Sequence, residues 1–219
     1  MDDRERRLAA IPWFASLPPP VREALVARGR WQRRPAGEWL YGEGDEDTGV
    51  TAVIEGALHL YSQAPGDREA LFNALPAGAV FGQSALFGGG PRLVTAICAV
   101  DSLVFLLPDQ ALRQVAAAHP SLWESLSTLV YGQLRAVVQG LAEFVALRPR
   151  ERMISRLITL SASGSRVATS QAALAEMVGV SRGAVNGWLT GLEAGGKIAC
   201  GYGWIDVVDR EGLRRMLNA

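Results

Sequence analysis

The 219-residue chain contains few of the side chains on which metal and redox sites depend. It has two cysteines, Cys98 and Cys200, and two histidines, His59 and His119. Four cysteines for an iron–sulfur cluster are therefore missing, and two histidines cannot supply a three-histidine zinc site. A site of two histidines and one carboxylate would need both histidines in one pocket. We expect no metal or other cofactor, structural roles for these four residues, and a cytoplasmic protein.

Membrane and catalytic signatures are missing too. No apolar run approaches the length of a membrane span, and the first residues, Met1–Arg7, are too charged for a secretory signal. The sequence has no Walker loop, Gly-x-Ser-x-Gly elbow or His-Glu-x-x-His motif. We therefore expect a protein that is not an enzyme and has no membrane partner. A cupin-type metalloenzyme, the remaining enzymatic alternative, fails on the histidine count.

The chain as a whole also lacks net charge, because 22 basic side chains balance 22 acidic ones. The balance is uneven, since residues 145–219 hold ten basic and six acidic side chains. A local basic surface on a neutral protein is typical of phosphate binding. The densest basic positions are Arg148, Arg150, Arg152, Arg156, Arg166, Arg182 and Lys197. The alternative is a merely solvated charged face, particularly over residues 148–156.

The most informative segment that is present, residues 169–192, predicts two short helices joined by a tight turn. Thr169 or Ser170 can cap the first helix, and Gly179 stands where the turn requires a positive φ. Ser181 can cap the second helix, whose apolar residues recur at three and four: Val185, Trp188, Leu189 and Leu192. This spacing indicates a helix-turn-helix, which presents its second helix to the DNA major groove. The alternative is a helical hairpin that binds no nucleic acid.

A small wing is predicted after these helices. Glycines at 195, 196, 201 and 203 bracket two strands, Lys197–Cys200 and Trp204–Val208. The candidate DNA-binding residues are Ser170, Gln171, Ser181, Arg182, Gly183, Asn186 and Lys197. Among them Arg182 is predicted to read a guanine through O6 and N7. Arg182→Ala should then relax specificity at one position per half-site, whereas uniform weakening would indicate a phosphate contact.

The remainder of the chain divides into three segments with different sequence patterns. Residues 1–30 predict short helices with an apolar cap, and residues 35–108 predict short strands punctuated by glycine, which suggests a β-barrel or jelly roll. Val53–Ile54 and Leu58–Tyr61 are interpreted as a hairpin-like pair around Glu55–Gly56. A long helix follows and ends before Pro149. The expected α+β organisation is a sensor domain over 1–119, a dimerisation helix over 120–147, and a winged helix-turn-helix domain over 148–219.

The long helix carries an apolar seam, spaced four, three, four and three: Val130, Leu134, Val137, Leu141 and Phe144. This is the a/d pattern of a coiled coil and fits a two-fold homodimer. The alternative is a helix packed on its own barrel. A two-fold protein reads paired half-sites about one helical turn apart, so the expected partner is double-stranded DNA with a palindromic site.

A glycine-punctuated barrel, a seamed helix and a winged helix-turn-helix, in that order, resemble the Crp/Fnr family of bacterial transcription regulators. Residues 78–95 (GAVFGQSALFGGGPRLVT) are similar to the family's phosphate-binding cassette, and residues 180–189 (VSRGAVNGWL) are similar to its recognition helix. The resemblance implies a cyclic-nucleotide-binding-like sensor barrel, a dimerising helix, a DNA reader set by the sensor, and RNA polymerase as a further partner.

The resemblance also implies the effector-binding positions, which are Gly82, Gln83, Ser84, Arg92, Leu93 and Val137. In cyclic-nucleotide-binding members a glutamate takes the ribose hydroxyl and an Arg–Ser pair holds the phosphate. Here the glutamate position is Gln83 and the serine position is Leu93, while Val137 and Val138 replace adenine-binding hydroxyls. Each lost partner costs about 1–3 kcal/mol. We therefore hypothesise that cyclic AMP is not the effector, and that the barrel binds something else or is locked without a ligand; cyclic AMP binding at micromolar concentration would contradict this.

Other branches of the family fit poorly. The cysteine cluster of the oxygen-sensing branch is missing, and neither histidine lies where a haem ligand is expected. In the recognition helix, Arg182 matches a reading arginine, whereas Gly183 and Gly187 replace two further readers. A helical glycine costs roughly 1 kcal/mol, so these glycines mark either close backbone approach or a weaker, shape-dependent reader. A small-molecule-binding barrel with a vestigial DNA module is the second hypothesis.

Overall fold

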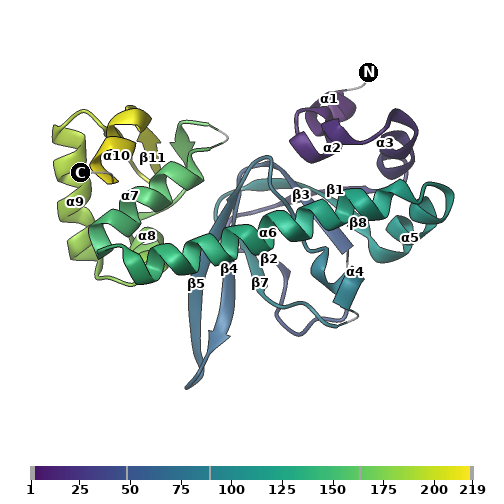
Figure 1. Cartoon of the computed structure of the whole chain (residues 1–219), viewed down its shortest axis with the longest axis horizontal. Coiled ribbons are helices and arrows are strands. Elements are labelled where there is room, and N and C mark those ends of the chain that lie inside the picture. Colours follow the sequence, from purple (N-terminus) through teal and green to yellow (C-terminus); the bar gives the residue numbers. More distant parts are fainter. Residues whose placement is uncertain (1–2, 48, 89, 163, 218–219) are drawn as a thin grey trace. The chain divides into compact units, whose positions relative to one another are not determined.

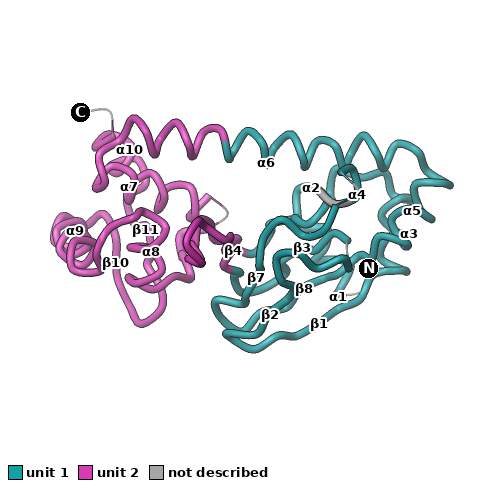
Figure 2. Tube along the Cα trace, turned by 90° about the horizontal axis from the view of Figure 1, so that it is seen from below, with its two compact units in different colours: residues 1–58, 77–137 teal, residues 59–76, 138–219 magenta. Residues whose placement is uncertain are grey.

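The computed structural model describes residues 3–47, 49–88, 90–162 and 164–217; for Asp3, Ser84 and Ala85 only the backbone is described. The chain divides into two compact units (Figure 2). The first comprises residues 1–58 and 77–137, and the second comprises residues 59–76 and 138–219. The two units therefore interleave along the sequence, and each is described by itself below.

The first unit begins with three short helices, α1 (Asp3–Ala9), α2 (Pro12–Ser16) and α3 (Pro19–Val26) (Figure 1). Proline occupies the first turn of α2 and of α3, where its missing N–H leaves no helical hydrogen bond unmade. The apolar residues expected to form a cap are all buried: Leu8, Ile11, Trp13, Phe14 and Leu17. Helix α5 (Asp109–Ala118) contacts α3, and the indole of Trp13 donates to the Ser125 carbonyl at 3.0 Å.

Two antiparallel sheets follow, as the jelly-roll prediction requires. One has the order β1 (Arg30–Arg34), β8 (Ser102–Pro108), β3 (Gly49–Glu55) and β6 (Val80–Phe81). In the other, β2 (Trp39–Tyr41) pairs with β7 (Thr95–Cys98), and β7 lies beside the start of β4 (Ala57–Ala64). The short helix α4 (Ser84–Gly88) lies between β6 and β7 in the chain. Val50, Ala52, Phe105 and Leu107 bury their side chains with the N-terminal helices.

The hairpin-like pair predicted around Gly56 is wrong. Strand β3 pairs with β6 and β8, whereas β4 belongs to the other sheet, so the chain passes from one sheet to the other here. Gly56 has a φ of +85°, and a Cβ at this position would lie 2.4 Å from the Ser102 Oγ. Two apolar runs around a glycine are compatible with either geometry, which is why the sequence pattern alone was misleading.

The second unit contains β5 (Arg68–Pro76) and all elements after the long helix α6 (Ser121–Ala146). These are α7 (Pro149–Leu160), β9 (Arg166–Val167), α8 (Gln171–Val178), α9 (Arg182–Ala194), β10 (Ile198–Gly201), β11 (Trp204–Val207) and α10 (Arg210–Leu217). The wing was expected to have two strands, but β9 pairs with β11, and the sheet has the order β10-β11-β9. A strand of two residues leaves no period for sequence analysis to detect.

Strand β5 packs on the helices of this unit. Leu71 and Ala74 are buried in the same cluster as residues of α7, α8 and α9. The Leu71 N–H donates to the Glu176 carboxylate at 2.9 Å, and the Arg156 guanidinium donates to Asn73 Oδ1 at 3.2 Å. Helices α7 and α8 are therefore held to β5 by apolar contacts and by charge-assisted hydrogen bonds.

His59, in the part of β4 that belongs to this unit, makes stability depend on pH. Its Nε2 is buried and has no hydrogen-bond partner among the described residues. Burial lowers the pKa of His59 below its usual 6.5, and the nearby Glu176 carboxylate opposes this shift only in part. Because the folded pKa is depressed, the stabilisation is fully present above pH 6.5 and is lost as the pH falls toward the folded pKa.

We therefore expect His59→Gln to reduce the pH dependence of stability. Between about pH 7.5 and about pH 5.5, the urea midpoint of the parent protein should fall more than that of the variant, because only the parent must protonate a buried imidazole. Urea unfolding at both pH values measures the difference. Equal shifts in the two proteins would show that His59 does not contribute.

Candidate DNA-binding and effector sites

The turn between α8 and α9 is built by local capping, as predicted. The Ser170 Oγ accepts a hydrogen bond from the Ala173 N–H at 3.1 Å and thereby caps α8. Gly179 ends α8 in the left-handed conformation, with φ +74°. The Ser181 Oγ accepts from the Ala184 N–H at 3.3 Å and starts α9. These contacts fix where each helix of the pair begins and ends.

Helix α9 buries one face and exposes the other. Val185, Leu189 and Leu192 are buried in the core of the second unit. The opposite face exposes four of the predicted DNA-binding residues, Ser181, Arg182, Gly183 and Asn186. The remaining helical candidates lie at the start of α8, where Ser170 is exposed and Gln171 is half-buried.

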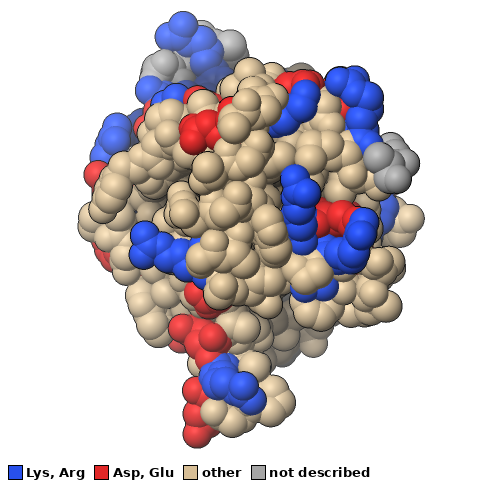
Figure 3. Space-filling model, turned by 90° about the vertical axis from the view of Figure 1, so that its left-hand side faces the viewer, with Lys and Arg blue, Asp and Glu red and all other residues tan. Residues whose placement is uncertain are grey.

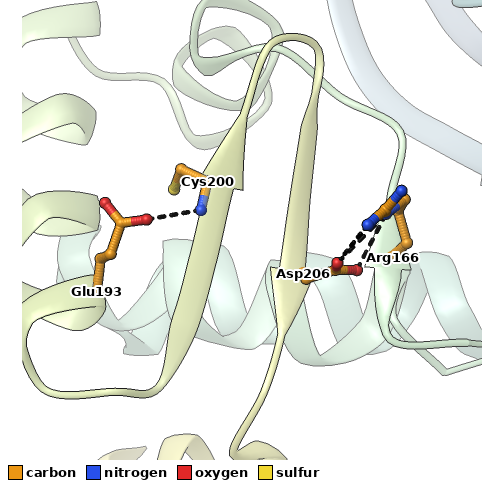
Figure 4. Close-up of polar contacts among 4 residues, drawn as sticks. All are labelled: Arg166, Glu193, Cys200 and Asp206. Atoms are coloured by element: carbon orange, nitrogen blue, oxygen red, sulfur yellow. Dashed lines mark hydrogen bonds and ion pairs between the residues drawn. The ribbon is translucent and has the colours of Figure 1, made fainter.

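The wing is anchored to its neighbours by polar contacts (Figure 4). The Glu193 carboxylate at the end of α9 accepts from the Cys200 N–H of β10 at 2.8 Å. The Arg166 guanidinium of β9 donates to the Asp206 carboxylate of β11 at 2.7 Å, which lowers the pKa of Asp206. Arg166 also lies 4.2 Å above the Trp204 ring, a cation–π contact. Tyr202, at the turn between β10 and β11, is fully exposed.

Most of the basic residues predicted to form a phosphate-binding face are engaged within the protein. Five of the seven contact another group of the protein: Arg148 binds Glu151, Arg152 donates to the Phe144 carbonyl, Arg156 to Asn73, Arg166 to Asp206, and Lys197 to Asp209. Within the part of the chain that the structure describes, Arg150 and Arg182 have no such side-chain partner. In the view of Figure 3, Lys and Arg form separate groups, some beside Asp or Glu and others among uncharged atoms. Carboxylates neutralise three of these five cations locally, whereas Arg152 and Arg156 keep their charge beside uncharged oxygens.

In the first unit, Arg92 is held by the protein itself. Its side chain is 6% exposed, and it donates to the carbonyls of Asp47, Gly49 and Gly82 at 2.9, 3.0 and 3.1 Å. The guanidinium lies 4.1 Å above the Tyr41 ring. Burial lowers the pKa of Arg92, and the nearby Tyr41 partly opposes this shift. Three backbone carbonyls and one aromatic ring thus surround the cation.

Gln83 is fully buried next to Gly82, whose carbonyl accepts from Arg92, and it lies close to Gln133 of α6. The Gln133 Nε2 donates to the Val80 carbonyl at 3.2 Å and lies 3.5 Å from the Gln83 Oε1. The Gln83 Nε2 has no hydrogen-bond partner among the described residues. Gln133 was not among the predicted effector-binding residues, although a polar residue between the apolar residues of Leu129–Leu134 was an available signal.

The structure brings together only some of the predicted effector-binding residues. Gly82, Gln83 and Arg92 lie together, and Gly82 adopts φ +94°, where a Cβ would lie 2.6 Å from the Gly49 carbonyl oxygen. Leu93 precedes β7 in the chain and is 65% exposed. Val137 is also exposed, on α6. The side chain of Ser84 lies outside the described part of the chain, which includes only its backbone at the start of α4.

The predicted dimerisation seam lies on the open surface of α6. Leu134, Val137, Leu141 and Phe144 are between 55% and 64% exposed, while Val130 is half-buried. Tyr131, Val138 and Val145 extend the exposed apolar surface. The N-terminal part of the same helix instead buries Leu122 and Leu126 against its own unit. Large apolar side chains exposed along one helix in this way are typical of an interaction surface.

Comparisons with known proteins decide the family. A model of the cyclic nucleotide-binding domain matches residues 31–119, and a model of the Crp-like helix-turn-helix domain matches residues 151–216. The two matches together cover more than half of the chain. This chain belongs to the Crp/Fnr family of transcription regulators. As a member of that family it is a DNA-binding regulator with a cyclic nucleotide-binding domain, and its family is one of regulators and not of enzymes.

Several known proteins resemble this one along most of their length. The CRP-like cAMP-activated global transcriptional regulator of Mycobacterium tuberculosis is 26% identical over 188 residues, which cover 82% of this chain and 84% of that protein. The cyclic AMP receptor protein of Thermus thermophilus is 26% identical over 200 residues, 90% and 92% of the two chains. The structure of FixK2 from Bradyrhizobium japonicum superposes with a TM-score of 0.74 at 21% identity, covering 85% of this chain and 96% of that one.

Neither a metal-binding cluster nor a membrane-spanning helix is found among the described residues. Over the described residues, no group of three or more His, Cys, Asp or Glu side chains is placed to hold a metal ion. Over the same residues, none of the helices combines the length and apolar character that crossing a membrane requires.

Proposed function

We propose that this protein is a homodimeric, sequence-specific DNA-binding regulator that reads a palindromic site and does not respond to cyclic AMP. The observation that carries the proposal is that one chain exposes two separate surfaces, one apolar and one polar. Helix α6 exposes an apolar seam, and α9 exposes Arg182 and Asn186 with no competing partner among the described residues. The first surface is suited to a second copy of the chain, and the second surface is suited to a polar target.

The homodimer follows from the seam and from the limits of one recognition helix. Apolar residues at spacings of four and three fit another helix with the same pattern, and a two-fold arrangement lets one stripe serve both protomers. A single recognition helix reads few base pairs, whereas two related helices read half-sites about one helical turn apart. RNA polymerase is proposed as a further partner on family membership alone.

The proposal that cyclic AMP is not the effector rests on the side chains at the effector-binding positions. Gln83 replaces a carboxylate, and its amide forms an uncharged and therefore weaker hydrogen bond to a hydroxyl than a carboxylate forms. Leu93 and Val137 are apolar and exposed, so they offer no donor to a phosphate or to a base. Arg92 already donates to three carbonyls, and a phosphate would have to compete with them. The barrel either binds another effector or needs none.

The proposal is tested by selecting duplexes from a randomised DNA library with the purified protein, with and without cyclic AMP. We expect enrichment of a two-fold symmetric sequence whose binding weakens steeply with salt and is unchanged by cyclic AMP. Enrichment of no sequence would support the alternative of a barrel protein with a vestigial DNA module. Enrichment that depends on cyclic AMP, with binding at micromolar concentration by calorimetry, would overturn the effector proposal.

A further inference from the structure

We infer that base readout in each half-site is carried by two side chains only, Arg182 and Asn186, and that Asn186 specifies an adenine. The inference rests on the proposed function, because it takes α9 as the helix that enters the major groove. It assigns to Asn186 a specificity-determining role that depends on which polar groups of α9 are free.

The exposed face of α9 offers few side chains that could reach a base. Its exposed residues are Arg182, Gly183, Asn186, Gly187, Thr190, Gly191, Glu193 and Ala194. Three of the eight are glycines and one is alanine, so four positions contribute no polar side chain. Direct readout by side chains of α9 is therefore left to the other four, because the exposed Ser181 before them uses its Oγ to cap the helix.

Two of those four are occupied within the protein. The Thr190 Oγ1 donates to the Asn186 carbonyl oxygen at 2.9 Å, which uses its single donor. The Glu193 carboxylate accepts from the Cys200 N–H at 2.8 Å and holds the wing strand β10 (Figure 4). A carboxylate would also be repelled by the DNA phosphates. Arg182 and Asn186 remain, and neither side chain has a hydrogen-bond partner among the described residues.

The chemistry of each free side chain selects a different base. A guanidinium donates twice to O6 and N7 of guanine, and a carboxamide both donates to N7 and accepts from N6 of adenine. Four residues of helix separate the two side chains, which places them on one face about 6 Å apart along the axis. We therefore expect one guanine and one adenine to be strongly specified within a short stretch of each half-site.

The glycines explain why further bases are left unread. A Cβ built at Gly187 or at Gly191 would meet no atom within 4 Å, so internal packing gives no reason for glycine at either position. The same is nearly true of Gly183, where the nearest atom is the Ser181 Oγ at 4.0 Å. Without side chains, these positions cannot discriminate between base pairs by direct contact.

The experiment compares sequence selection by the parent with selection by Asn186→Ala, Asn186→Gln and Arg182→Ala. Thr190→Ala is the matched control on the same helix, and thermal unfolding establishes that each variant folds. For the parent we expect two strongly specified base pairs per half-site. Asn186→Ala should make the adenine position indifferent and weaken the selected duplex about tenfold or more, with little effect on a duplex that already lacks that A·T pair.

Each outcome decides a different point. Asn186→Gln, which keeps the carboxamide, should restore part of the adenine preference, and Thr190→Ala should keep both specified positions. If Asn186→Ala weakens all duplexes equally, Asn186 contacts phosphate and the inference fails while the proposed function stands. The inference also fails if selection by Asn186→Ala matches that of the parent. If the parent selects no sequence, it is the proposed function that fails.

Discussion

Replacing Leu134 and Leu141 together by glutamate should leave the protein monomeric and lower its affinity for a two-half-site duplex by about 100-fold or more. Both side chains are exposed in the protomer, so the substitutions should not disturb the fold of the protomer. In a dimer they would bring like charges together and remove them from water, which is costly without a partner of opposite charge. A monomer then loses the gain that comes from binding both half-sites at once.

The matched control places the same two charges elsewhere on α6. Thr128 and Gln139 are exposed and lie on the opposite side of the helix from the seam. Thr128→Glu combined with Gln139→Glu should keep the dimer and the parental affinity. Sedimentation gives the mass and fluorescence anisotropy gives the affinity. A seam variant that remains dimeric with parental affinity would show that α6 is not the interface.

Arg92→Met should lower the free energy of unfolding by about 3 kcal/mol without any effector. The substitution leaves the carbonyls of Asp47, Gly49 and Gly82 without the donor that they share in a buried setting. It also removes the cation from the Tyr41 ring. A residue that served only to bind an effector would contribute little to stability when the effector is missing.

Arg113→Met provides the comparison for this prediction. Arg113 forms an exposed ion pair with Asp109 at 2.8 Å, and such pairs contribute about 1 kcal/mol or less. Urea unfolding should therefore separate the two variants clearly. Parental stability for Arg92→Met would mean that its hydrogen bonds to carbonyls contribute nothing, and that Arg92 is free to serve an effector alone.

The sequence was most informative where structure is decided locally. Ser170 and Ser181 cap helices by accepting from amides three residues away. Gly179 occupies the one position of the turn that needs a left-handed backbone conformation. The seam of α6 could be predicted for the same reason, because the helical repeat places its residues on one face. These features depend on residues within a few positions of one another.

The sequence was least informative where distant segments meet. Two apolar runs around Gly56 could not reveal that β3 pairs with β8, some 50 residues away, instead of with β4. A basic count could not reveal that Arg156 is engaged by Asn73, or Arg166 by Asp206. In the effector region the contact of Gln83 with Gln133 joins residues 50 apart. Pairing partners of this kind are fixed by tertiary packing and leave no local pattern.

We propose that two copies of this chain act together on one DNA site. Native mass spectrometry of the protein bound to its selected duplex tests it most directly, because the mass gives the number of chains and duplexes in one complex. We expect two chains on one duplex, and we expect the seam variant not to form this complex. One chain on one duplex, at protein concentrations well above the dissociation constant, would contradict it.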